Sequence, residues 1–170
     1  MDKGDKAPLS FSIPGTTGSQ DFEKYTISEY IESGPLVLAF YPFDFSPVCV
    51  SELCKFRDAE WLTVTENLDL FGISRDACYS HSRFIEEYDL PFPLLSDIEG
   101  NLTEAFGVKY KEWELHEGVP KRAVFIIDSE GVIQYKWSSD DAYDNPDVEE
   151  LARQIAALPS TSFQANDLLE

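Results

Sequence analysis

The chain has 170 residues, of which 43% are apolar and 14% aromatic, so it is long and apolar enough to fold around one sizeable core. Its 32 Asp and Glu against 13 Lys and Arg give a formal net charge of −19 at pH 7, which disfavours nucleic acid and anionic membranes as partners. The carboxylates are spread along the whole chain, as on the surfaces of proteins from salt-loving organisms. We therefore hypothesise a halophilic source, which greater stability in molar salt than in dilute buffer would support and an equal stability would contradict.

No Gly/Ser linker, internal repeat or low-complexity tract divides the chain, which predicts one domain over residues 1–170. The N-terminal residues are charged and lack the apolar core of a secretory signal, and the longest apolar stretch, near 35–43, is far shorter than a membrane span. We therefore expect a soluble, cytoplasmic protein. Its three cysteines are too few for a secreted disulfide scaffold, which leaves structural, metal-binding or catalytic thiols.

The first half of the chain contains two apolar runs separated by a helical pattern. An irregular N-terminal stretch rich in Gly, Ser and Thr precedes a short helix expected at 28–33. The apolar run 36–41 indicates a buried strand, and a second one is predicted at 68–73. Between them, residues 47–66 contain no Gly and only the initial Pro, with apolar residues at roughly helical spacing, which predicts one helix.

The second half of the chain adds an insertion, two strands and a final helix. The predicted elements are a helix at 79–88, an extended segment at 91–95, a short helix at 102–106, strands at 122–127 and 132–137, and a helix at 146–158 with Pro at its start. The turn signal Ser129-Glu-Gly makes the two strands a hairpin. The order is a βαβ unit joined to a ββα unit, which predicts an α/β protein with a thioredoxin-like fold, a central mixed sheet flanked by helices.

This topology predicts where a site lies. The βαβ crossover makes the first two buried strands parallel, so their C-terminal ends share one sheet edge, where ligands of open α/β sheets bind. Cys49 and Arg75 follow those two ends in the sequence. If the strand that begins at Arg122 runs antiparallel to the pair, its first residue arrives at the same edge. We therefore expect the Cys49 thiol and the Arg122 guanidinium to meet.

Cys49 is placed for nucleophilic chemistry. Ser46 can act as N-cap and Pro47 suits the first helical position, so Cys49 falls within the first turn of the helix. Unpaired backbone N–H groups, the helix dipole and a nearby arginine all favour a thiolate there. The alternative, a buried structural cysteine, does not explain a capped helix start with a convergent arginine.

A family resemblance is carried by the run from Pro42 to Cys49, PFDFSPVC. It resembles the peroxiredoxin signature, in which a Pro is followed by three residues, a Thr or Ser, two residues and the peroxidatic Cys. Ser46 stands where most members have Thr, which preserves the hydroxyl. The similarity extends over about residues 36–137, and further matches are Glu52, SRDACYSHSRF (74–84), PFPLLSD (91–97) and VPKRAVFIID (119–128).

This resemblance implies a thiol-dependent peroxidase without a metal or other cofactor. Cys49 would attack the O–O bond of hydrogen peroxide or an organic hydroperoxide and become a sulfenic acid. Ser46 and Arg122 would donate hydrogen bonds to the thiolate and to the peroxide oxygens. Pro42 would shield the sulfenic acid from water, and Glu52 would orient an arginine through an ion pair.

A second cysteine, Cys54, lies five positions after Cys49. Five helical residues separate two Cα atoms by about 8 to 9 Å, whereas a disulfide tolerates about 7 Å, so the two cysteines cannot bond while the helix is intact. The resemblance is closest to the peroxiredoxin Q or bacterioferritin-comigratory subgroup, which implies that Cys54 resolves the sulfenic acid after the helix start unwinds. A thioredoxin-like or glutaredoxin-like reductant would then reduce the disulfide. The family also suggests a homodimer.

Several alternatives remain open from the residues alone. Cys78 follows the second strand and could resolve Cys49 instead, form a disulfide with a partner chain, or be a semi-buried thiol without a role in the reaction. A zinc site using Cys49, Cys54, Cys78 and His81 is disfavoured, because the first two diverge on a helix. His81 is expected to be an exposed or hydrogen-bonded helix residue, and His116 gives no catalytic signal. Two other functions are a thioredoxin-type disulfide oxidoreductase, which normally has a Cys-x-x-Cys pair, and a redox-sensing interaction module.

Overall fold

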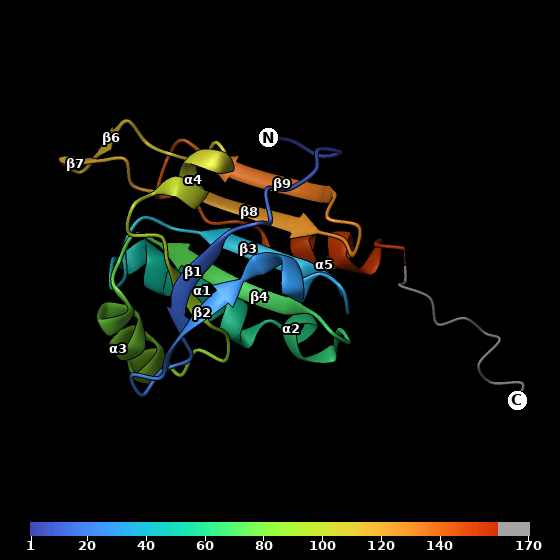
Figure 1. Cartoon of the computed structure of the whole chain (residues 1–170), viewed down its shortest axis with the longest axis horizontal. Coiled ribbons are helices and arrows are strands. Elements are labelled where there is room, and N and C mark those ends of the chain that lie inside the picture. Colours follow the sequence, from blue (N-terminus) through green and yellow to red (C-terminus); the bar gives the residue numbers. More distant parts are fainter. Residues whose placement is uncertain (160–170) are drawn as a thin grey trace, which may run out of the picture.

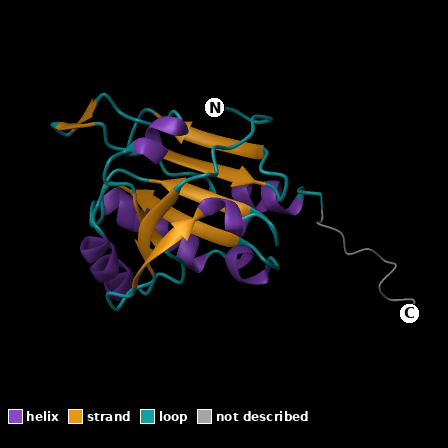
Figure 2. Cartoon of the chain, in the orientation of Figure 1, coloured by secondary structure: helices purple, strands orange, loops and turns teal. Residues whose placement is uncertain are grey.

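The computed structural model describes residues 1–159, and its centre is a seven-stranded mixed sheet (Figures 1 and 2). The strands of this sheet are β1 (Ser12–Thr16), β2 (Phe22–Thr26), β3 (Leu36–Phe40), β4 (Asp69–Ser74), β5 (Leu94–Ser96), β8 (Arg122–Ile127) and β9 (Ile133–Ser139). Their order across the sheet is β2-β1-β5-β4-β3-β8-β9. Two short strands, β6 (Glu112–Trp113) and β7 (His116–Glu117), form a separate hairpin.

Helices cover both faces of the sheet. They are η1 (Ile27–Tyr30, a 3-10 turn), α1 (Pro47–Asp58), α2 (Glu60–Val64), α3 (Cys78–Tyr88), α4 (Asn101–Ala105) and α5 (Val148–Ala156). The central strand β3 is buried along its whole length, and its side chains alternate between two cores. Val37 and Ala39 pack in the core that α1, α2, α3 and α5 cover, whereas Leu36, Leu38 and Phe40 pack in the core that α4 and η1 cover.

The strand directions confirm the predicted βαβ and ββα units. Strand β3 pairs in parallel with β4 and antiparallel with β8, and β8 pairs antiparallel with β9. In this register Phe40 lies opposite both Ile73 and Ala123, so the end of β3 and the start of β8 share one sheet edge. Arg122, the first residue of β8, therefore lies at the edge from which the Cys49 loop leaves, as the topology predicted.

The prediction of one helix over 47–66 is wrong, because the helix breaks after Asp58. Ala59 has an extended backbone with ψ 125°, and α2 starts at the next residue. The break lets Trp61 bury its indole, whose Nε1–H donates to the Val148 carbonyl at 3.2 Å. Tertiary packing against α5 thus overrides a local sequence that contains no helix breaker.

The N-terminal region is also more regular than predicted. Strands β1 and β2 form a hairpin on the edge of the sheet, and the helix expected at 28–33 is only the short turn η1. Pro14 and Gly15 interrupt the pattern that would reveal a strand. A Cβ added at Gly15 would lie 2.5 Å from Cδ2 of Leu95, so the close approach of β1 to β5 requires glycine there.

Helix α5 lies where the sequence predicted its final helix, with a different start. Asp147 is the N-cap, and its carboxylate accepts the backbone N–H groups of Glu149 and Glu150. Pro146 therefore precedes the cap and does not occupy the first helical position. The prediction of one domain over 1–170 extends past the described residues and stays a prediction.

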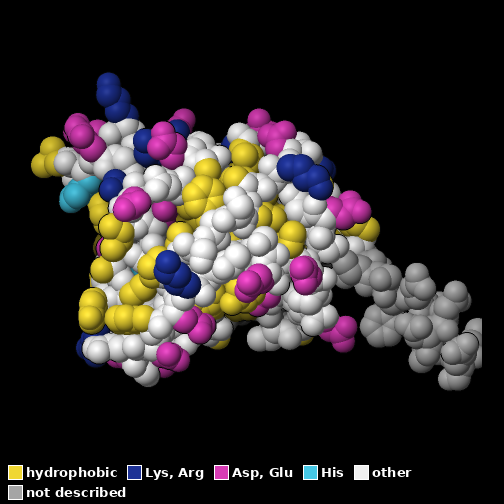
Figure 3. Space-filling view, in the orientation of Figure 1, with side chains coloured by type: hydrophobic (Ala, Val, Ile, Leu, Met, Phe, Trp, Pro, Cys, Tyr) yellow, Lys and Arg dark blue, Asp and Glu magenta, His cyan; other side chains and the backbone are white. Residues whose placement is uncertain are grey.

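Charged side chains of both signs lie on the face of the molecule that Figure 3 shows. On the face seen in Figure 3, Asp and Glu side chains are scattered over several elements with Lys and Arg between them. This distribution does not test the hypothesis of a halophilic source, which stays a prediction. In the described part of the chain, 1–159, no helix combines the length and the apolar character that crossing a membrane requires.

Candidate active site

The helix start at Cys49 has the predicted backbone, but Ser46 uses its side chain differently. Ser46 is the N-cap residue with an extended backbone, and Pro47 follows at the first helical position. The Ser46 side chain makes no capping hydrogen bond. Its hydroxyl donates to Cys49 Sγ at 3.2 Å. Ser46 is thus the N-cap residue by position, as predicted, but the prediction that its side chain caps the helix is wrong, because the hydroxyl contacts the Cys49 thiol.

Arg122 is the second donor to the sulfur. Its side chain is fully buried, and Nη2 lies 3.3 Å from Cys49 Sγ. Nη1 donates to Glu52 Oε2 at 2.5 Å, while Nε and Nη2 both donate to the Ala142 carbonyl at 3.0 and 2.8 Å. A guanidinium held by a carboxylate and a carbonyl has little freedom to leave the sulfur. The Ala142 carbonyl was not foreseen, because a backbone oxygen carries no side-chain signal in the sequence.

The expected lowering of the Cys49 pKa is wrong for this structure. Burial raises the pKa of the Cys49 thiol above its ordinary value, although the Arg122 guanidinium and the Ser46 hydroxyl act in the opposite direction. The side chain is fully buried, and the cost of ionising it away from water outweighs its two donors. Burial therefore disfavours the thiolate, and a thiolate that forms there meets two aligned donors.

Glu52 is the buried partner of Arg122. Burial raises the pKa of the Glu52 carboxyl to about 7, although the neighbouring guanidinium lowers it. One carboxylate oxygen, Oε2, accepts the Arg122 bond. The other, Oε1, has no hydrogen-bond partner in the described residues. The ion pair that the resemblance implied for Glu52 is thus made with Arg122.

We expect Glu52→Gln to remove a pH dependence of the free energy of unfolding. Because the folded pKa lies above the ordinary value of 4.5, the unfolded chain loses this proton first as the pH rises. The stability that protonated Glu52 provides is then present below about pH 4.5 and is lost as the pH approaches 7, with a slope of at most about 1.4 kcal/mol per pH unit. Urea unfolding of both proteins between pH 4 and 8 measures this, with the exposed Glu104→Gln as control. Parallel curves for the parent and Glu52→Gln would contradict the assignment.

The other two cysteines are free thiols at different distances along the chain from Cys49. Cys54 is partly buried in the same unbroken helix α1, which is incompatible with a disulfide to Cys49 unless that helix opens. Cys78 is buried as the first residue of α3. Burial raises the pKa of both thiols. Which of them resolves Cys49 stays a prediction.

Pro42 and Arg75 were also predicted to lie near the site. Pro42 is buried in the loop that precedes Cys49. Arg75 hydrogen-bonds the carbonyls of Ile98, Glu117 and Gly118, so it ties β7 to the body of the protein. Among residues 1–159, no three His, Cys, Asp or Glu side chains are arranged to hold a metal ion.

A groove of about 400 Å³ lies beside the site. Its walls are largely apolar and include Phe43, Trp113 and Tyr143, and it also reaches Ser46 and Ala142, the two residues that contact the Cys49 sulfur and the Arg122 guanidinium. The walls come from the loop before α1, the β6-β7 hairpin and the loop 140–145. Sequence reasoning missed this groove, because its three segments are far apart along the chain.

Comparisons with known proteins show the family of this chain. Residues 3–136 match the model of the AhpC/TSA family. Peroxiredoxin Bcp of Bacillus subtilis is 36% identical over 140 residues, which cover 79% of this chain and 83% of that protein. The spinach 2-Cys peroxiredoxin BAS1, chloroplastic, is 33% identical over 165 residues, and the chain spans 93% of its own length but only 60% of that protein. The crystal structure of peroxidoxin BcpB from Mycobacterium tuberculosis has 30% identity and a TM-score of 0.77 over 94% of this chain and 99% of that one. The predicted thioredoxin-like fold is confirmed.

Proposed function

The chain belongs to the AhpC/TSA family and is a peroxiredoxin, and we propose that it acts as a thiol-dependent peroxidase whose reacting group is the Cys49 sulfur. The observation that carries this proposal is the convergence of two hydrogen-bond donors, the Ser46 hydroxyl and the Arg122 guanidinium, on that sulfur. The substrate is hydrogen peroxide or an organic hydroperoxide. It enters through the groove that reaches Ser46 and Ala142.

In the first step the Cys49 thiolate attacks one oxygen of the peroxide. The S–O bond forms as the O–O bond breaks, sulfur is oxidised to the sulfenic acid, and the other oxygen leaves as water or an alcohol after taking up the proton that the thiol released when it ionised. Negative charge develops on the leaving oxygen, and the Ser46 and Arg122 donors are placed to stabilise it. Glu52 and the Ala142 carbonyl hold the guanidinium in that position, and Pro42 shields the product from water.

In the second step we assign Cys54 as the resolving cysteine. Its thiolate attacks the Cys49 sulfenic acid, a disulfide forms, and water leaves. The start of α1 must unwind first, because both residues lie in that helix. Opening a helix end is among the least costly local rearrangements of a fold. A thioredoxin-like or glutaredoxin-like dithiol then reduces the exposed disulfide.

The two competing functions have weaker support. A thioredoxin-type disulfide oxidoreductase needs two cysteines that can pair at a helix start, whereas Cys49 and Cys54 are held apart by α1. A redox-sensing module would need only oxidation of Cys49 and no rapid turnover. Preorganised donors at the sulfur favour the peroxidase. A homodimer, which the family resemblance suggests, and a cytoplasmic location, which was predicted from the sequence, remain proposals.

Peroxide oxidation of the reduced protein tests the proposal. We expect a fast change in tryptophan fluorescence whose rate is proportional to the peroxide concentration while oxidation of Cys49 is the slowest step. The centroid of the Trp61 ring lies 6.1 Å from that of Phe56 in α1, so the fluorescence reports the helix opening that follows oxidation. After one equivalent of peroxide, mass spectrometry should find a Cys49–Cys54 disulfide. Cys54→Ser should stop at the sulfenic acid, and the matched Cys78→Ser should behave like the parent.

The other outcomes are equally informative. A Cys49–Cys78 disulfide would assign the resolving role to Cys78 and leave the peroxidase proposal standing. Slow oxidation that does not depend on peroxide concentration would contradict the peroxidase and favour the redox-sensing module.

A further inference from the structure

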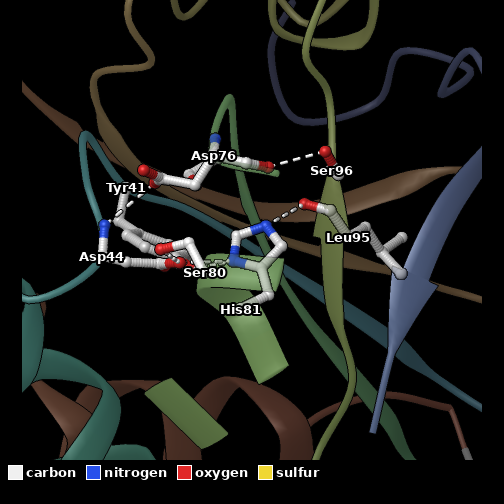
Figure 4. A network of polar contacts seen from close by, with 8 residues as sticks. Tyr41, Asp44, Asp76, Ser80, His81, Leu95 and Ser96 are labelled. Atoms are coloured by element: carbon white, nitrogen blue, oxygen red, sulfur yellow. Dashed lines mark hydrogen bonds and ion pairs between the residues drawn. The ribbon is translucent and has the colours of Figure 1, made fainter. Parts of the chain in front are cut away.

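A second buried polar network lies beside the active-site loop and takes no part in the steps above (Figure 4). Its centre is His81 on α3, whose side chain is fully buried. The ring atom Nε2 lies 3.0 Å from the Leu95 carbonyl, and Nδ1 lies 2.8 Å from Oδ2 of Asp44. The sequence suggested only an exposed or hydrogen-bonded helix residue. The structure confirms the hydrogen bonds and links His81 to the loop that carries Ser46.

The two contacts of His81 require a proton between the ring and Asp44. A carbonyl oxygen only accepts, so Nε2 carries hydrogen toward Leu95. If Nδ1 and the Asp44 carboxylate were both bare, two lone pairs would face each other at 2.8 Å. The hydroxyl of Tyr41 donates to Asp44 Oδ1 at 2.6 Å, and that of Ser80 donates to Oδ2 at 2.8 Å. A shared proton on this side of the ring and the two hydroxyl donors therefore hold the Asp44 side chain against α3.

The backbone of Asp44 has an anchor of its own. Its N–H donates to Oδ2 of Asp76 at 2.9 Å, and the Ser74 hydroxyl donates to the same oxygen at 2.6 Å. The Ser96 hydroxyl donates to the Asp76 carbonyl at 2.6 Å. Asp44 is thus fixed to the segment between β4 and α3 through its main chain and to α3 through its side chain.

Residues next to Asp44 contact the reacting sulfur or are strained. Phe45 adopts a left-handed backbone with φ +64°, which is costly for a bulky residue and persists only where the surroundings hold it. Ser46 follows, and its hydroxyl lies 3.2 Å from the Cys49 sulfur. Releasing Asp44 would let the strained Phe45 relax and would move the Ser46 donor.

We propose that His81 is a positioning residue for the reaction of Cys49, acting through Asp44 to keep the Ser46 hydroxyl on the sulfur. The inference rests on the proposed peroxidase function. Residue 81 itself touches neither the sulfur nor the groove in this arrangement. Its role is to hold, through its contacts with Asp44 and the Leu95 carbonyl, a loop whose backbone is strained.

Two substitutions of His81 test the proposal, because each preserves one half of the ring. In His81→Asn the amide nitrogen replaces Nδ1 and can still donate to Asp44, whereas in His81→Gln it replaces Nε2 and can donate only to Leu95. We expect the second-order rate constant with hydrogen peroxide to fall about 100-fold in His81→Gln and only about 10-fold in His81→Asn. A purely structural role predicts that both variants are equally impaired, and equal rate constants would overturn the proposal.

A second readout does not depend on peroxide. Alkylation of Cys49 by iodoacetamide, followed against pH in a Cys54→Ser, Cys78→Ser background, reports ionisation of the thiol. Loss of the Ser46 donor removes stabilisation of the thiolate, so the apparent pKa of Cys49 should be higher in His81→Gln than in the parent. An unchanged pH profile in a folded variant would overturn the inference even if the parent lacked peroxidase activity, and a slow parent would contradict only the proposed function.

A milder pair of variants keeps the test valid if the His81 variants do not fold. Tyr41→Phe removes a buried hydroxyl that donates to the Asp44 carboxylate at 2.6 Å. Thr103→Val is the matched control, because it removes a buried hydroxyl that donates to a different carboxylate, that of Asp97, at the same distance. We expect Tyr41→Phe to slow the peroxide reaction several-fold, on the order of 3-fold, and Thr103→Val to leave it unchanged. Equal rates for the two variants would contradict a role for the Asp44 network.

Discussion

Replacing Cys49 by serine is expected to abolish the rapid reaction with hydrogen peroxide, with a fall in the second-order rate constant of at least about 1000-fold. A serine hydroxyl remains protonated near neutral pH and its oxygen does not attack the peroxide bond, so Ser46 and Arg122 have no nucleophile to assist. Stopped-flow fluorescence with hydrogen peroxide in excess measures the constant. Cys78→Ser, which makes the same chemical change at another buried thiol, is the matched control and should keep the parent rate.

The pH dependence of the parent reaction gives a further check on the same residue. Because burial raises the pKa of Cys49, the thiolate fraction and therefore the rate constant should increase as the pH rises above 7. Cys49→Ser should show no such increase. A variant that retains the fast phase would remove Cys49 from the mechanism, and a parent rate that is flat from pH 6 to 9 would show that its thiol is already ionised.

Replacing Arg122 by methionine is expected to reduce both the reaction rate and the stability. Methionine keeps much of the length of the side chain but removes the donor to the Cys49 sulfur and the positive charge beside Glu52. Loss of a preorganised donor to the developing charge lowers the rate constant about 100- to 1000-fold. The free energy of unfolding should fall by about 3 to 5 kcal/mol, because a fully buried carboxyl loses its partner. Stopped-flow kinetics and urea unfolding give the two quantities.

A neighbouring cation provides the control for Arg122. Lys121 precedes it in the chain and pairs with Asp140, whose side chain is 89% exposed. Lys121→Met should keep the parent rate and a stability within experimental error of the parent, because exposed ion pairs contribute little. The double variant Glu52→Gln, Arg122→Met should regain stability relative to Arg122→Met but not the rate. Recovery of the rate would mean that the guanidinium acts only by neutralising Glu52.

The burial of the sulfur has two consequences for the proposed reaction. It raises the pKa of Cys49 and so reduces the fraction of thiolate in the closed, reduced protein. In the proposed mechanism it also keeps bulk water away from the sulfenic acid until Cys54 reacts with it. We propose that a smaller thiolate fraction is balanced by protection of the product, and that opening of α1 ends this protection.

Much of the candidate site was predictable, because its signals are local. The run from Pro42 to Cys49 places a hydroxyl and a thiol at a helix start, and the continuous apolar runs of β3 and β8 indicate two strands buried on both faces. Once the first of these strands is central, the antiparallel hairpin carries Arg122 to the same edge. Periodicity and topology therefore determined the fold and the meeting of Cys49 with Arg122.

Other properties of the site depend on segments that are distant along the chain. The helix break at Ala59, the carbonyl of Ala142 that holds Arg122, and the pairing of His81 with Asp44 have no marker in their own neighbourhoods. The direction of the Cys49 pKa shift also differs from the local prediction. The helix dipole and the nearby arginine, which lower the pKa of the thiol, can be inferred from the sequence, whereas the extent to which packing desolvates the thiol cannot.

The sequence by itself thus determined which groups are the candidates for the reaction, because residue identity and helix or strand periodicity are properties of short segments. Only the tertiary structure decided how strongly those groups are perturbed and what holds them. Desolvation, backbone carbonyls and buried ion pairs arise when remote segments pack together, and their energies depend on that packing.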